Sequence, residues 1–135
     1  MLKKDKIVEK DVGYAEDSFA LLKQSMGQEE HFLGNFIDSK SEKDLKKLNE
    51  ARNIRTELLN SIIEVMGIEL KGQNWCILKH VCATAMHTQE LINRCSMMGL
   101  TKIASRLAEC HKLLYLNYLE LLGINENNIS NKTSA

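Results

Sequence analysis

Residues 15–36, AEDSFALLKQSMGQEEHFLGNF, decide the fold of this 135-residue chain. Most residues at alternating steps of four and three are apolar, which places one of them per turn on a single face of a helix. Residues 45–66, LKKLNEARNIRTELLNSIIEVM, repeat this spacing, and each such row is called a seam below. The seams predict two amphipathic helices that pack side by side. Their positions are Ala15, Phe19, Leu22, Met26, Glu29, Leu33 and Phe36, and then Leu45, Leu48, Arg52, Arg55, Leu59, Ile62 and Met66.

Two more seams follow in the second half of the chain. Their positions are Leu78, Val81, Ala85, Thr88, Ile92 and Cys95, and then Ile103, Leu107, Cys110, Leu114, Asn117 and Leu121. Short connections containing Gly67, Gly99 and other turn residues separate the helical segments, and the chain has no proline. The expected helices cover residues 12–38, 41–66, 75–98 and 101–122, with Ser41 and Asn74 as N-terminal caps. We therefore predict an all-α, single-domain, antiparallel up-down-up-down four-helix bundle. Residues 1–10 and 124–135 are expected to be disordered.

The composition narrows the classes of function. The 18 basic and 18 acidic residues balance, whereas a protein that grips nucleic acid usually has a basic excess, so such a partner is not expected. The start of the chain is charged, and no apolar run approaches membrane-spanning length. With four cysteines inside helical segments, we expect a cytoplasmic protein with reduced thiols and no membrane contact. No phosphate-binding glycine loop is present, and no cofactor is predicted.

Three ionisable residues, Glu29, Arg52 and Arg55, occupy seam positions where apolar residues are usual. Folding the hairpins back on themselves places Glu29 and Thr88 opposite Arg52, and Ala85 opposite Arg55. His111 falls near the same layer. One interpretation is an ion pair that fixes the register of the helices. The other is a ligand site in which Glu29, Arg52, Arg55, Thr88 and His111 bind a small anion or metabolite.

Cys76 and His80 lie four residues apart on one helical face, a spacing that can chelate zinc. Two further ligands would be required, and the candidates are Cys110 and His111. The alternative is that these residues are ordinary small or boundary side chains of the bundle.

The stretch Arg106-Leu107-Ala108-Glu109-Cys110-His111 is similar to the Arg-x4–6-His pattern of HEPN-type ribonucleases, which are small helical proteins. The resemblance covers these six residues. It implies that Arg106 and His111 form a catalytic pair and that two subunits of a dimer complete an RNA-cleaving site. The balanced charge of the chain departs from what such a site requires.

Met86, Met97 and Met98 predict an exposed apolar strip suited to self-association. The first hypothesis is therefore a non-enzymatic binding or interaction module that forms a homo-oligomer or binds another protein. A small-anion binder and a HEPN-like ribonuclease are the alternatives.

Overall fold

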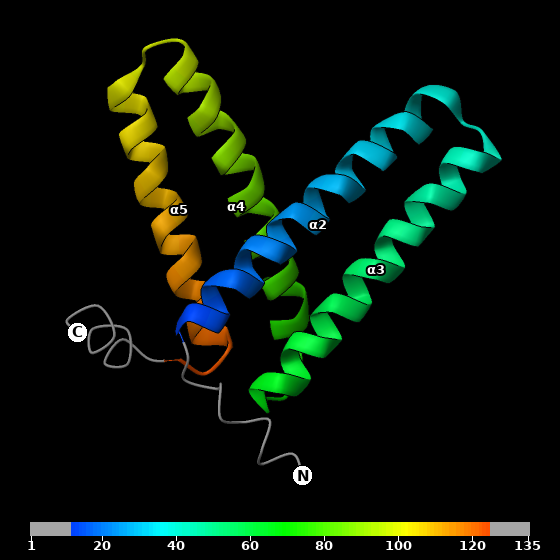
Figure 1. Cartoon of the computed structure of the whole chain (residues 1–135), viewed down its shortest axis with the longest axis horizontal. Coiled ribbons are helices and arrows are strands. Elements are labelled where there is room, and N and C mark those ends of the chain that lie inside the picture. Colours follow the sequence, from blue (N-terminus) through cyan, green and yellow to red (C-terminus); the bar gives the residue numbers. More distant parts are fainter. Residues whose placement is uncertain (1–11, 125–135) are drawn as a thin grey trace.

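Four long α-helices form the computed structural model of the chain, which describes residues 12–124 (Figure 1). They are α2 (Val12–Ser39), α3 (Glu42–Met66), α4 (Asn74–Met97) and α5 (Thr101–Leu121). Successive helices run antiparallel, so the predicted all-α, up-down-up-down arrangement of four helices is confirmed. The predicted helix bounds differ from these by at most one residue. Of the ends expected to be disordered, residues 1–10 and all of 124–135 except Ile124 lie outside the described part of the chain.

Local interactions explain where the helices begin and end. The hydroxyl of Ser41 accepts a hydrogen bond of 3.2 Å from the backbone amide of Asp44, the predicted cap of α3. Gly67 (φ 68°) ends α3 in the left-handed conformation that glycine adopts without strain. The prediction that Asn74 caps α4 was wrong, because Asn74 is the first residue of that helix. Gln73 precedes it and makes no side-chain capping bond.

The two helical hairpins, α2–α3 and α4–α5, share one end and diverge at the other (Figure 1). Most of the contact between the hairpins is made by α2 against α4. We call the shared end the base, comprising residues 12–26, 58–66, 75–86 and 111–124. The first arm is residues 29–52, and the second arm is residues 88–110. Among residues 12–124, no helix lies between the diverging arms.

The hydrophobic core lies in the base, where all four helices contribute. Its largest fully buried side chains are Tyr118, Leu22, Leu59, Met66, Leu78, Leu119, Leu122, Ile124 and Cys82. Ile124 belongs to the segment expected to be disordered, and its burial corrects that expectation at this residue. In contrast, Ala51 and Cys95 are the buried residues within the two arms.

The seam predicted for α5 has the wrong phase near the end of the helix. Cys110 and Asn117 are exposed, whereas Tyr118 and Leu119 are fully buried. A polar contact explains how Tyr118 is accommodated, because its hydroxyl lies 2.6 Å from that of Ser18. The Ser18 hydroxyl donates its single hydrogen to the Ala15 carbonyl at 2.9 Å, so Tyr118 is the donor.

Gly27 marks the close approach of α2 to α4. A Cβ atom added there would lie 3.4 Å from the Met86 terminal methyl group, whereas one added at Gly34 would meet nothing within 4 Å. Met86 is buried against this glycine and does not extend the strip predicted from Met97 and Met98.

Candidate functional site

Glu29 and Arg55 form the ion pair at the point where the hairpins separate. Arg55 Nε donates to Glu29 Oε1 at 2.6 Å, and Arg55 Nη2 donates to Glu29 Oε2 at 3.2 Å. The Arg55 side chain is 13% exposed and the Glu29 side chain is 23% exposed. The two parallel hydrogen bonds are therefore largely shielded from water. The prediction that Glu29 pairs with Arg52 was wrong by one helical turn. Arg55 is therefore the paired arginine, whereas Arg52 is exposed and forms no ion pair with a carboxylate of residues 12–124.

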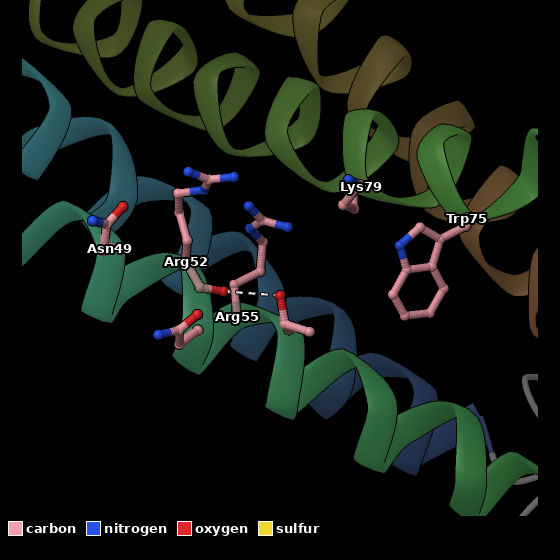
Figure 2. Close-up of a pocket in the computed structure, with 7 residues that line it drawn as sticks. Asn49, Arg52, Arg55, Trp75 and Lys79 are labelled. Carbon is pink, nitrogen blue, oxygen red and sulfur yellow. Dashed lines mark hydrogen bonds between the residues drawn. The ribbon is translucent and has the colours of Figure 1, made fainter.

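A basic cavity of about 490 Å³ opens beside this pair, between α3 and α4. Figure 2 shows Arg52 and Arg55 extending from α3 toward the side of α4 that carries Trp75 and Lys79. No carboxylate in residues 12–124 lies within 4 Å of the charged nitrogens of Arg52 or Lys79. The remaining lining residues are polar, namely Asn49, Asn53 and Thr56. Cations, amide groups and an indole ring thus surround one space, an arrangement that suits an anion with a flat apolar part.

Thr88 and His111, the other residues of the predicted layer, lie elsewhere. The Thr88 hydroxyl donates to the Thr84 carbonyl of its own helix at 2.7 Å. Neither residue lines the cavity that contains Arg52, whereas Lys79 and Trp75 do. The sequence approach missed Lys79 and Trp75 because neither is at a seam position, although both lie near the start of the helix that faces α3.

His111 belongs to a second polar cluster, where the base meets the second arm, together with Lys23 and Gln89. Lys23 Nζ donates to Gln89 Oε1 at 2.7 Å and lies 3.1 Å from His111 Nε2. Lys23 Nζ is 5.2 Å from the centre of the Phe19 ring, and the His111 ring meets the same ring edge-on. Burial lowers the pKa of both residues, and the charge of Lys23 lowers that of His111 further.

Sequence reasoning did not single out Lys23, but the sequence carries a signal for it. The residues three and four positions away on either side are Phe19, Ala20, Met26 and Gly27. Because none is acidic, Lys23 has no carboxylate of its own helix to pair with. It is also adjacent to Leu22 in the seam, which places it at the edge of the core.

The two residues of the HEPN-like pattern have different surroundings. Arg106 is exposed on α5, whereas His111 is half-buried and in contact with Lys23. The cavity that His111 lines does not include Arg106. The two side chains therefore do not meet in this cavity.

The Cys76 and His80 side chains both lie exposed on α4. His111 is one of the ligands proposed to complete a zinc site, but its Nε2 atom contacts Lys23 Nζ instead. Within residues 12–124, no group of three or more potential metal ligands is brought together.

Large apolar side chains are exposed on both arms. Their exposed fractions range from 37% at Leu33 to 86% at Met97. The set comprises Leu33, Ile37 and Leu45 on the first arm and Leu91, Met97, Met98, Leu100 and Ile103 on the second. Several of these residues, including Leu33, Leu45 and Ile103, belong to the seams, which the sequence pattern predicted to face the interior of a bundle.

Comparisons with protein families, curated proteins and solved structures found no match to this chain. None of the described helices combines the length and apolar character that a bilayer-spanning helix needs.

Proposed function

We propose that this protein is a non-enzymatic interaction module that self-associates through its two arms. A single observation carries the proposal: the apolar seams continue along the arms, where, among residues 12–124, only the other helix of the same hairpin lies against them. Leu22 and Leu33 belong to one seam of α2, yet Leu22 is fully buried and Leu33 is 37% exposed. A seam that stays partly exposed in one chain is expected to pack against a seam of another chain.

A second copy is the partner that fits best, because each arm is half of a four-helix bundle. The seam of the first arm contains Leu33, Phe36, Leu45 and Leu48, and the seam of the second contains Ile92, Ile103 and Leu107. In a closed bundle these two surfaces would cover each other. If the first arm of one copy packs against the second arm of another, both surfaces are covered. A two-fold axis then makes this contact twice.

The size of the exposed set also favours contact along whole arms. Burial of one large apolar side chain contributes about 1.5–3 kcal/mol, and less where part of it is already covered. Association of two proteins costs about 4–15 kcal/mol in lost freedom of motion. Several of the eight exposed arm residues must therefore be covered together, and these residues are distributed over both arms.

Light scattering after size exclusion tests the proposal with a matched pair of variants. Ile103 in the second arm and Ile77 at the base are both 45% exposed. We expect a concentration-dependent mass above the 15.4 kDa of one chain, shifted toward that value by Ile103→Glu and unchanged by Ile77→Glu. A constant mass of one chain, or equal effects of the two variants, would contradict the proposal.

The basic cavity supports a second candidate function, the binding of a small anion. The specific observation is that Arg52 and Lys79 converge on one space with Trp75 while lacking a carboxylate partner in residues 12–124. Each hydrogen bond to a charged ligand contributes about 1.5–3 kcal/mol, so Arg52→Ala is expected to weaken binding at least about tenfold.

Trp75 is the single tryptophan of the chain, so its fluorescence reports on this cavity directly. The titration uses phenyl phosphate, with inorganic phosphate in parallel to separate charge recognition from ring contact. Lys102→Ala, which removes an exposed cation on α5, is the control. A saturable change in the parent that Arg52→Ala weakens is expected. Absence of a saturable change, or equal loss in both variants, argues against this function.

A further inference from the structure

Lys23 is a buried lysine whose amine contacts only uncharged partners in the described part of the chain. The residue is 9% exposed, and no carboxylate of residues 12–124 forms an ion pair with it. Its Nζ atom contacts Gln89 Oε1, 2.7 Å away, and His111 Nε2, 3.1 Å away. A lysine that served as a structural cation would be expected to pair with an acid when it is this buried.

The two partners are suited to the neutral form of the amine. Gln89 Oε1 accepts one hydrogen, and His111 Nε2 can accept the second when the imidazole carries its proton on Nδ1. A neutral amine has two hydrogens and one lone pair, so both hydrogens are then held and the lone pair remains available. Burial, which lowers the pKa of Lys23, favours this uncharged form.

A cavity of about 250 Å³ adjoins the amine between α2 and α5. Phe19, His111 and Tyr115 contribute aromatic walls, while Glu16 and Lys112, both exposed, contribute charged groups to the lining. The cavity thus joins a nucleophilic nitrogen to an imidazole that can move protons. Its volume suits a small organic molecule with few heavy atoms.

We propose that Lys23 is a covalent attachment site for a small aldehyde that enters this cavity. The Nζ lone pair attacks the carbonyl carbon, which forms the C–N bond and places the electron pair of the C=O bond on oxygen. His111 Nε2 takes a proton from the attacking nitrogen and passes it to the oxygen, which gives a neutral carbinolamine. His111, protonated from solvent, then gives a proton to the hydroxyl, and water leaves to form an iminium. The iminium loses its N–H proton to solvent and becomes the imine. Overall, one aldehyde and one amine yield one imine and one water, with no change of oxidation state.

Lys112 is an internal control, because it lines the same cavity and is exposed. The experiment exposes the whole protein to propionaldehyde with sodium cyanoborohydride near pH 7, and peptide mass mapping follows each lysine over time. Positioned proton transfer contributes about 10²–10⁴-fold to such reactions, so Lys23 should be labelled at least about tenfold faster than Lys112. This ratio comes from the parent protein and does not depend on the folding of a variant.

His111→Gln then distinguishes the contribution of His111 to the labelling rate of Lys23 from the contribution of burial. Glutamine can still accept a hydrogen bond but cannot relay a proton, so labelling of Lys23 should fall at least about tenfold and that of Lys112 should not change. If Lys23 reacts no faster than Lys112, or if His111→Gln leaves the ratio between them unchanged, the proposal is overturned. Because the cavity lies in the base, the result is independent of whether the arms associate.

Discussion

The base and the arms are built from the same four helices and the same seams, but they differ in what covers them. In the base, seam residues such as Leu22, Leu59 and Leu78 are completely buried. Along the arms, Leu33, Leu45 and Ile103 remain 37–45% exposed. The difference shows that hydrophobic periodicity predicts an apolar helical face but not how completely the rest of the chain buries that face. The predictions below test this contrast between base and arms.

The largest difference is expected between two leucines of one α2 seam. Leu22→Ala should lower the free energy of unfolding by about 2–5 kcal/mol, because it leaves a cavity in a filled core. Leu33→Ala should cost less than about 1 kcal/mol at low protein concentration, where its side chain is partly in water. Urea denaturation measures both. Equal losses would mean that the arm is as tightly packed as the base.

A smaller effect is expected at the junction of base and arms, where two arginines one turn apart have different partners. Glu29→Ala leaves the 13%-exposed Arg55 side chain without its carboxylate, and should cost about 1–3 kcal/mol. Arg52→Ala removes an exposed cation and should change stability by less than about 0.5 kcal/mol.

A double-mutant cycle provides the control for this assignment. Glu29→Ala should show coupling to Arg55→Ala and none to Arg52→Ala, as measured by thermal or urea unfolding. Coupling of Glu29 to Arg52 would restore the pairing expected from hairpin geometry and refute the observed one.

The base should also lose stability on mild acidification. Burial and the neighbouring Lys23 lower the folded-state pKa of His111 below its ordinary value of 6.5. The folded state therefore binds fewer protons than the unfolded chain. The corresponding stability is present above pH 6.5 and is lost as pH falls toward the folded-state pKa. Urea midpoints from about pH 7.5 to about pH 5.5 should decline in the parent and decline less in His111→Gln. Identical pH profiles would remove His111 as the cause.

The smallest effect is expected at two glycines of α2. Gly34→Ala places a methyl group in open space within the first arm and should stabilise the helix by about 0.5–1 kcal/mol. Gly27→Ala gains the same helix propensity, but its methyl group meets Met86 at 3.4 Å, so the net gain should be smaller. Thermal unfolding under identical conditions compares the two. A larger gain at Gly27 would contradict the close approach of α2 to α4.

The sequence predicted the four helices well because periodicity and end signals are local. Ser41 and Gly67 act at the ends of α3 as their residue types suggest. The pairing of Glu29 was missed because it depends on how two helices are aligned, and a slip of one turn exchanges Arg52 for Arg55. The divergence of the hairpins depends on the angle at which α2 crosses α4, which no residue pattern specifies.

The candidate sites were less predictable than the helices because they depend on how the helices are arranged in space. Lys79 and Trp75 reach the basic cavity from outside the seams, and Thr88 instead bonds to its own helix. Lys23 and His111 are 88 positions apart in the sequence, and the fold alone brings them together.

Hydrogen–deuterium exchange at two protein concentrations tests most directly whether the arms associate. We expect amides of residues 29–52 and 88–110 to exchange more slowly at high concentration, because a second copy covers these arms. Amides of the base, including those around Leu22 and Leu78, should exchange at rates that change little with concentration. Arm exchange that is equally fast at both concentrations would contradict self-association through the arms.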